Sequence, residues 1–161
     1  MFQILKILLK KNTFHRVLND HADFKKYGLI ELKEDKKIKK VIICSGKIYF
    51  DLIEGREKIK NREVFIIRIE QLYPFPAKTL VKELKPYSKR AKFYWCQEEP
   101  KNMGAWFSVR DYIQWTLETI KAKNNNISYI GRNPDASPAT GYAKRHMVEQ
   151  EEIIKKVFDN E

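Results

Sequence analysis

Four short apolar runs, each followed by an amphipathic stretch, constrain the fold more than any other feature of the sequence. The runs occupy residues 41–44, 64–69, 91–96 and 127–130. Continuous apolarity is typical of strands covered on both faces of a sheet. Apolar residues at helical steps of three and four follow the runs, in residues 47–60, 74–84, 105–120 and 144–158. This alternation predicts an α/β domain with a largely parallel sheet between two layers of helices.

The length and composition favour one globular domain. The 161 residues are enough to bury a core, and 43% of them are hydrophobic, which excludes a disordered chain. Residues 1–39 lack a sustained period, so we expect a short apolar helix and then an irregular arm or linker, with the domain in residues 40–161. Lys6 interrupts the opening apolar stretch, and no signal peptide or membrane span is expected.

Charge and cysteine content narrow the function classes. The net charge is +11, but the basic residues are spread along the chain, which favours a solvated basic surface over nucleic-acid binding. Cys44 and Cys96 lie in strand-like runs without the spacing of a zinc site. We expect both to be buried thiols in a reducing compartment.

Ligands of a parallel sheet bind at the carboxyl ends of the strands. The turn Ser45-Gly46-Lys47 leads from a strand into a helix, so its N–H groups and lysine are candidates to hold an anion. The spacing of a phosphate-binding P-loop is absent. The alternative is a tight turn with a serine cap.

Two further loops carry candidate residues. Glu98 and Glu99 are adjacent, so on an extended segment they point to opposite sides and are not expected to act as a facing acid–base pair. The loop 131–142 is long enough to be functional. His146, beside Lys144 and Arg145, is either an anion ligand or part of a solvated helix start.

The motifs of common catalytic centres are absent. The sequence has no GxSxG, HExxH or GxGxxG segment, and no Gly-Asp-Gly motif for a metal and a diphosphate. We therefore assign no catalytic, cofactor-binding or metal-binding residue to this chain.

Several segments nevertheless resemble one enzyme family in their order and spacing. They are KKVIICSGKIYFDL, RIEQLYPFP, WCQEEPKNMGAW, YIGR and SPATGYAKRHMVEQ. Together they resemble the C-terminal domain of the decarboxylating component of 2-oxoglutarate dehydrogenase over residues 40–158. The resemblance implies a transketolase-type C-terminal domain, which is a three-layer α/β/α sandwich with a mostly parallel five-stranded sheet.

The resemblance also implies a function for the parent enzyme. That enzyme uses thiamine diphosphate and magnesium to decarboxylate 2-oxoglutarate in the tricarboxylic acid cycle, and passes the succinyl group to a lipoyl domain. The family's cofactor-binding domains lie upstream, and no residue here matches their motif. We therefore expect a structural piece that binds no cofactor and is inactive alone.

The implied partners are the catalytic domains of the same component, a second copy in the parent homodimer, and the succinyltransferase core. Neither nucleic acid nor membrane is an expected partner. The implied location is the bacterial cytoplasm, or the mitochondrial matrix in a eukaryote. The loop with Glu98 and Glu99 is expected to hold neighbouring domains in place.

A regulatory role is the alternative. Some relatives bind a regulatory nucleotide or acyl-CoA on or near this domain, which makes Lys47, Arg68 and Lys78 candidate effector ligands. The second hypothesis is a free-standing module that binds an anionic nucleotide, such as AMP or an acyl-CoA, through Ser45-Gly46-Lys47 and nearby basic side chains.

Overall fold

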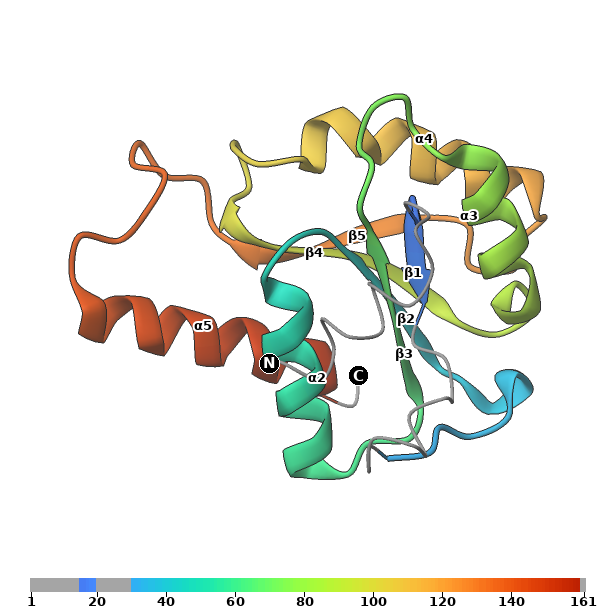
Figure 1. Cartoon of the computed structure of the whole chain (residues 1–161), viewed down its shortest axis with the longest axis horizontal. Helices are drawn as coiled ribbons and strands as arrows, with labels where there is room; N and C mark the ends of the chain where they lie inside the picture. The colour runs from blue at the N-terminus through green and yellow to red at the C-terminus, as the bar shows by residue number, and fades with distance from the viewer. Residues whose placement is uncertain (1–14, 20–29, 160–161) are drawn as a thin grey trace.

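The predicted alternation of strands and helices is present in the computed structural model, which describes residues 15–19 and 30–159 (Figure 1). The strands are β1 (Val17–Asn19), β2 (Lys40–Cys44), β3 (Val64–Ile69), β4 (Lys92–Pro100) and β5 (Ile127–Arg132). The helices are α2 (Ile48–Ile59), α3 (Ala77–Leu84), α4 (Trp106–Thr119) and α5 (Ala143–Phe158). Short 3-10 turns occupy Asp35–Lys37 and Lys85–Tyr87.

The strands form one sheet in the order β1-β3-β2-β4-β5, and only β1 is antiparallel to its neighbour. The chain moves from β2 to β3 in one direction, and then passes back over β2 to reach β4. Because crossovers between parallel strands are right-handed, this reversal places α2 on one face of the sheet and α3 on the other. Helix α4 shares the face of α3, whereas α5 packs beside α2.

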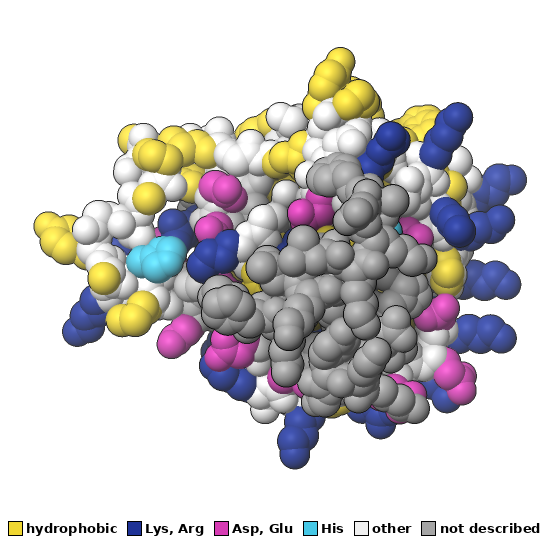
Figure 2. Space-filling view, viewed as in Figure 1, with side chains coloured by type: hydrophobic (Ala, Val, Ile, Leu, Met, Phe, Trp, Pro, Cys, Tyr) yellow, Lys and Arg dark blue, Asp and Glu magenta, His cyan; other side chains and the backbone are white. Residues whose placement is uncertain are grey.

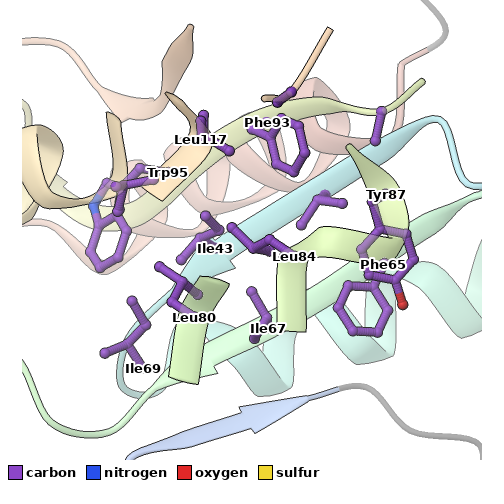
Figure 3. Close-up of a cluster of buried hydrophobic side chains, with 14 of the residues drawn as sticks. Ile43, Phe65, Ile67, Ile69, Leu80, Leu84, Tyr87, Phe93, Trp95 and Leu117 are labelled. Carbon is purple, nitrogen blue, oxygen red and sulfur yellow. The ribbon is translucent and has the colours of Figure 1, made fainter. Parts of the chain in front are cut away.

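Two hydrophobic clusters fill the spaces between the sheet and its helices. On one face, Ile43 and Ile67 pack with Leu80 of α3 and Leu117 of α4 (Figure 3). On the other face, Ile42 and Ile66 contribute to a cluster with α2 and α5. Alternate residues of one strand thus supply opposite clusters. This arrangement confirms the three-layer α/β/α sandwich with a mostly parallel five-stranded sheet.

Both cysteines are buried, as expected from their position in the strand runs. Cys44 and Cys96 have no exposed surface, and burial raises the pKa of the Cys96 thiol well above its usual value. A buried neutral thiol of this kind packs as a small hydrophobic group.

The segment before residue 40 is more closely integrated than we expected. Strand β1 adds to the sheet edge beside β3, and Ile38 is 1% exposed within the core. A three-residue strand is too short to show a period, and Ile38 stands alone among lysines. The described part of this segment therefore differs from an irregular arm, while the domain boundary at residue 40 stays a prediction. The expected N-terminal helix lies outside the described residues.

Among the helices that the structure describes, none combines the length and the apolar character needed to cross a bilayer.

The contact between α2 and α5 generates a stability prediction. Gly55 is buried there, and a Cβ at this position would lie 2.5 Å from Cγ2 of Ile154. Although alanine is a better helix former by about 1 kcal/mol, we expect crowding to dominate. Gly55→Ala should lower the free energy of unfolding by about 1–3 kcal/mol in urea titrations.

The control places the same substitution beside a smaller neighbour. In an Ile154→Ala background, Gly55→Ala should cost nothing or stabilise, because the crowding methyl group is gone. An equal loss of stability in both backgrounds would show that the helix contact is not the cause.

Candidate functional site

The carboxyl ends of β2 and β4 lie side by side at the point where the chain's connections diverge. The chain leaves β2 toward β3 and leaves β4 toward β5, and such a switch point is where open α/β sheets bind ligands. Ser45, Gly46 and Lys47 follow β2, and Glu98 lies near the carboxyl end of β4, so four of the predicted residues are found here. The switch point is therefore the first candidate site.

The charged side chains at the switch point bind one another. The Lys47 amine lies 2.9 Å from a carboxylate oxygen of Asp51 and 3.8 Å from one of Glu98. The amide of Gln150, from α5, donates to Asp51 at 2.8 Å and to Glu98 at 3.4 Å. The hydrogen bond with Asp51 raises the pKa of Lys47. One ammonium group thus faces two carboxylates, which disfavours the binding of an anion.

The turn that precedes α2 has the expected tight conformation but lacks the serine cap. Gly46 has φ of 74°, a conformation that glycine adopts without strain, so the tight turn is present. The N-cap residue is Lys47, and no side-chain hydrogen bond caps the helix. The expected serine cap by Ser45 is therefore wrong, because the helix begins beyond the reach of a Ser45 cap.

The loop after β4 is organised by Gln97, which the sequence analysis missed. Its side-chain oxygen accepts hydrogen bonds from the Trp95 indole at 2.9 Å and from the Trp106 backbone N–H at 3.0 Å. Its amide donates to the carbonyl oxygens of Met103, Pro100 and Glu99 at 2.7, 3.1 and 3.2 Å. Gln97 is 2% exposed, so one buried amide ties the end of β4 to the start of α4.

Glycine at position 104 completes this loop. Gly104 has φ of 64°, and a Cβ there would lie 2.8 Å from the Gln97 amide nitrogen. The sequence offered a weak signal, namely a polar residue at the end of an apolar strand shortly before a glycine. The two carboxylates of this loop have different surroundings, since Glu98 faces Lys47 whereas Glu99 is exposed.

His146 belongs to a separate cluster at the end of β5. Its Nδ1 lies 2.7 Å from a guanidinium nitrogen of Arg132. Arg132 also pairs with Glu149 at 3.0 Å, and Arg145 pairs with the same carboxylate at 2.7 Å. Arg132, Arg145 and Glu149 border a cavity of about 390 Å³ beneath the loop 131–142. His146 instead lines a cavity of about 620 Å³ that it shares with Lys47 and Gln150. Arg145 also lies 4.0 Å from a carboxylate oxygen of Asp135, so each of the two arginines has a carboxylate partner.

The candidate effector residues do not converge. Arg68 is 4% exposed, and its guanidinium lies 4.7 Å from the ring centre of Tyr49 while it pairs with Glu70. Lys78 is exposed on α3, which covers the opposite face of the sheet from Lys47 on α2. The structure therefore does not bring Lys47, Arg68 and Lys78 together as one basic site.

In the described ranges 15–19 and 30–159, no three His, Cys, Asp or Glu side chains lie close enough together to hold a metal ion. That the chain binds no thiamine diphosphate stays a prediction.

Comparison with known proteins identifies a family. Residues 5–158 match the family model described as "2-oxoglutarate dehydrogenase C-terminal". The "2-oxoglutarate dehydrogenase E1 component" of Brucella anthropi is 45% identical over 156 residues, and that of Brucella ovis is 48% identical over 139 residues. These alignments cover 97% and 86% of this chain but only 16% and 14% of the relatives.

A solved structure supports the fold. The chain aligns with one titled "Split gene transketolase, inactive beta4 tetramer", with a TM-score of 0.51 and 14% identity. The alignment covers 78% of this chain and 39% of that chain. At this identity the likeness concerns the fold alone, and it agrees with the transketolase-type domain implied by the sequence.

The hydrogen bonds of Gln97 generate the next prediction. Gln97→Met keeps the shape of the side chain but leaves the Trp95 indole and the Trp106 N–H without an acceptor. We expect a loss of about 2–4 kcal/mol in the free energy of unfolding, since each unsatisfied buried group costs about 1–3 kcal/mol. Glu99→Gln, at an exposed position, should change stability by less than about 0.5 kcal/mol. Equal stabilities of the two variants would refute this role.

The pKa of Tyr129 generates a prediction about alkaline stability. Its hydroxyl donates to the carbonyl oxygens of Glu99 and Arg132, and burial is the main cause that raises its pKa from 10.0 to about 12. Folding therefore favours the protonated phenol. The contribution of Tyr129 to the free energy of unfolding is fully present below about pH 10, the ordinary pKa of tyrosine. It is lost as the pH rises through about 12.

The measurement is the tyrosinate absorbance of the unsubstituted protein minus that of Tyr129→Phe. The difference should titrate near pH 12, and the unfolding free energy of Tyr129→Phe should depend less on pH between about 10 and 12. A difference that titrates near pH 10 would contradict the raised pKa.

Proposed function

Because the chain belongs to the 2-oxoglutarate dehydrogenase C-terminal family, we propose that it serves as the C-terminal domain of a 2-oxoglutarate dehydrogenase E1 component. In this role it supports the assembly of a larger enzyme that decarboxylates 2-oxoglutarate and succinylates a lipoyl domain. Thiamine diphosphate and magnesium are then held outside this chain. The chain spans about one sixth of the length of the relatives it matches, since it covers 16% of one and 14% of the other.

The bonding among the charged side chains at the switch point is the observation that supports a structural role. In an open α/β sheet this position is the expected ligand site. Here Lys47 and Asp51 at the start of α2 bond with Glu98 of β4 and Gln150 of α5. Charged groups that bond one another in this way hold the end of the sheet in shape. This is what a domain that positions its neighbours requires.

The proposed partners follow from the same role. They are the catalytic domains of the same component, a second copy in a homodimer, and the succinyltransferase core. The two relatives named above come from bacteria of the genus Brucella, so we propose the cytoplasm as the location.

The regulatory alternative is less well supported. It requires the turn Ser45-Gly46-Lys47 and nearby basic side chains to hold an anion, but Lys47 and Arg68 have carboxylate partners and Lys78 lies on another face. No contact in the described residues favours a nucleotide or acyl-CoA over these internal partners.

A chimera tests the proposed function. This chain would replace the matched C-terminal region of the Brucella anthropi relative, and the assay is 2-oxoglutarate-dependent reduction of ferricyanide with thiamine diphosphate and magnesium. We expect activity from the chimera, because the domain would restore the architecture of the component. The isolated chain, and the relative without its C-terminal region, should be inactive.

Calorimetric titration of the isolated chain with thiamine diphosphate and magnesium is the control, and it should give no binding heat. Activity or cofactor binding by the isolated chain would contradict the proposal. So would a folded chimera that is no more active than the truncated relative.

A further inference from the structure

Exposed aromatic side chains gather on a surface formed by α4 and the loop between β3 and α3. Nine large hydrophobic side chains are exposed among the described residues, and five of them belong to α4 or the loop between β3 and α3. These five, called the aromatic surface below, are Leu72, Tyr73, Phe107, Tyr112 and Trp115. Figure 2 shows hydrophobic side chains along the upper edge of the molecule, over this loop and α4. Large exposed apolar patches mark interaction sites.

The aromatic surface is a built feature that joins two segments. The ring of Tyr112 stacks on that of Phe75, with centroids 5.0 Å apart and planes at 13°. This contact fixes the β3–α3 loop against α4. The inner side of α4 is already occupied by buried residues such as Val109 and Ile113. Its outer side carries Phe107 and Trp115, which are 55% and 51% exposed, where a helix facing only water would carry polar groups.

The charges around the aromatic surface do not favour a polyanion. On the outer side of α4, Arg110 and Asp111 pair with each other at 2.9 Å. The Arg110 guanidinium also lies 5.7 Å from the ring centre of Phe107. The chain as a whole has a net charge of +11, yet this helix face is close to neutral. Exposed Trp and Tyr side chains in neutral surroundings are typical of protein–protein hot spots.

The path of the chain indicates which protein covers this surface. The carbonyl oxygen of Arg16 accepts hydrogen bonds from the backbone N–H of Glu70 at 2.9 Å and of Gln71 at 3.3 Å. Glu70 and Gln71 directly precede Leu72 and Tyr73. The chain therefore enters the sheet beside the aromatic surface. The matched region is 16% or less of the relatives, so most of their polypeptide lies outside it and is available to cover a surface of this domain.

We propose that the aromatic surface is where the larger, preceding part of the E1 component packs against this domain. The inference rests on the proposed function, and it adds the location of the contact. The partner surface is predominantly apolar, with Phe107 and Trp115 at the centre of the contact.

Cysteine labelling in the chimera described above tests the location. The side chain of Asp111 is 81% exposed and lies one helical turn from both Phe107 and Trp115, so Asp111→Cys reports on the aromatic surface. The matched control is Lys58→Cys, at a side chain 71% exposed on α2. Cys44 and Cys96 are buried and give little background. We expect maleimide to react with Asp111→Cys at least about tenfold more slowly in the chimera than in the isolated chain.

In the chimera, the control Lys58→Cys should react at its rate in the isolated chain. Adding Trp115→Ser to Asp111→Cys should restore fast labelling.

Slow labelling of Lys58→Cys with fast labelling of Asp111→Cys would overturn the location but leave the assembly standing. Fast labelling at both positions would overturn the location and count against the assembly too. Protection in the isolated chain that grows with protein concentration would identify a second copy as the occupant and overturn the proposal.

Discussion

Strand β2 is buried on both faces and paired on both edges, and the remaining structure depends on this constraint. All five of its residues are buried, and its neighbours are β3 and β4. Burying two faces requires two helical layers, and a single right-handed crossover can cover only one of them. The chain therefore reverses direction between β3 and β4. That reversal creates the switch point and places α3 and α4 on the face of the sheet opposite α2 and α5. Four loops then lie at one edge.

At that edge, the side chains are used to hold structure together. Lys47 and Glu98 join the start of α2 to β4, Gln150 adds α5, and Gln97 joins β4 to α4. The buried amide of Gln97 contributes only when its partners are present, because an unsatisfied group costs more than a hydrogen bond gains. The residues that a ligand would need are consequently engaged. This is consistent with a domain whose contribution to a larger enzyme is its shape and its surface.

Periodicity predicted the layers, the four parallel strands and the helices to within a few residues, because burial leaves a repeating pattern. The fifth strand came from the family resemblance, since three residues such as Val17–Asn19 carry no period. Gln97 was missed because its importance comes from Trp106 and Met103 meeting in space. Arg68 was taken for a candidate ligand, and only the structure places it against Tyr49. Interactions between distant segments leave little trace in a single sequence.

The position of β1 has a practical consequence for work on the isolated domain. Its residues hydrogen-bond to β3, and the register pairs Val17 with Ile69. Without β1, the long apolar strand β3 would become a bare sheet edge, and such edges template the pairing of one chain with another. A shorter version of the protein that starts at residue 40 would keep most of the core and still be prone to aggregate. The few residues at the edge thus protect the solubility of a domain to whose core they add little.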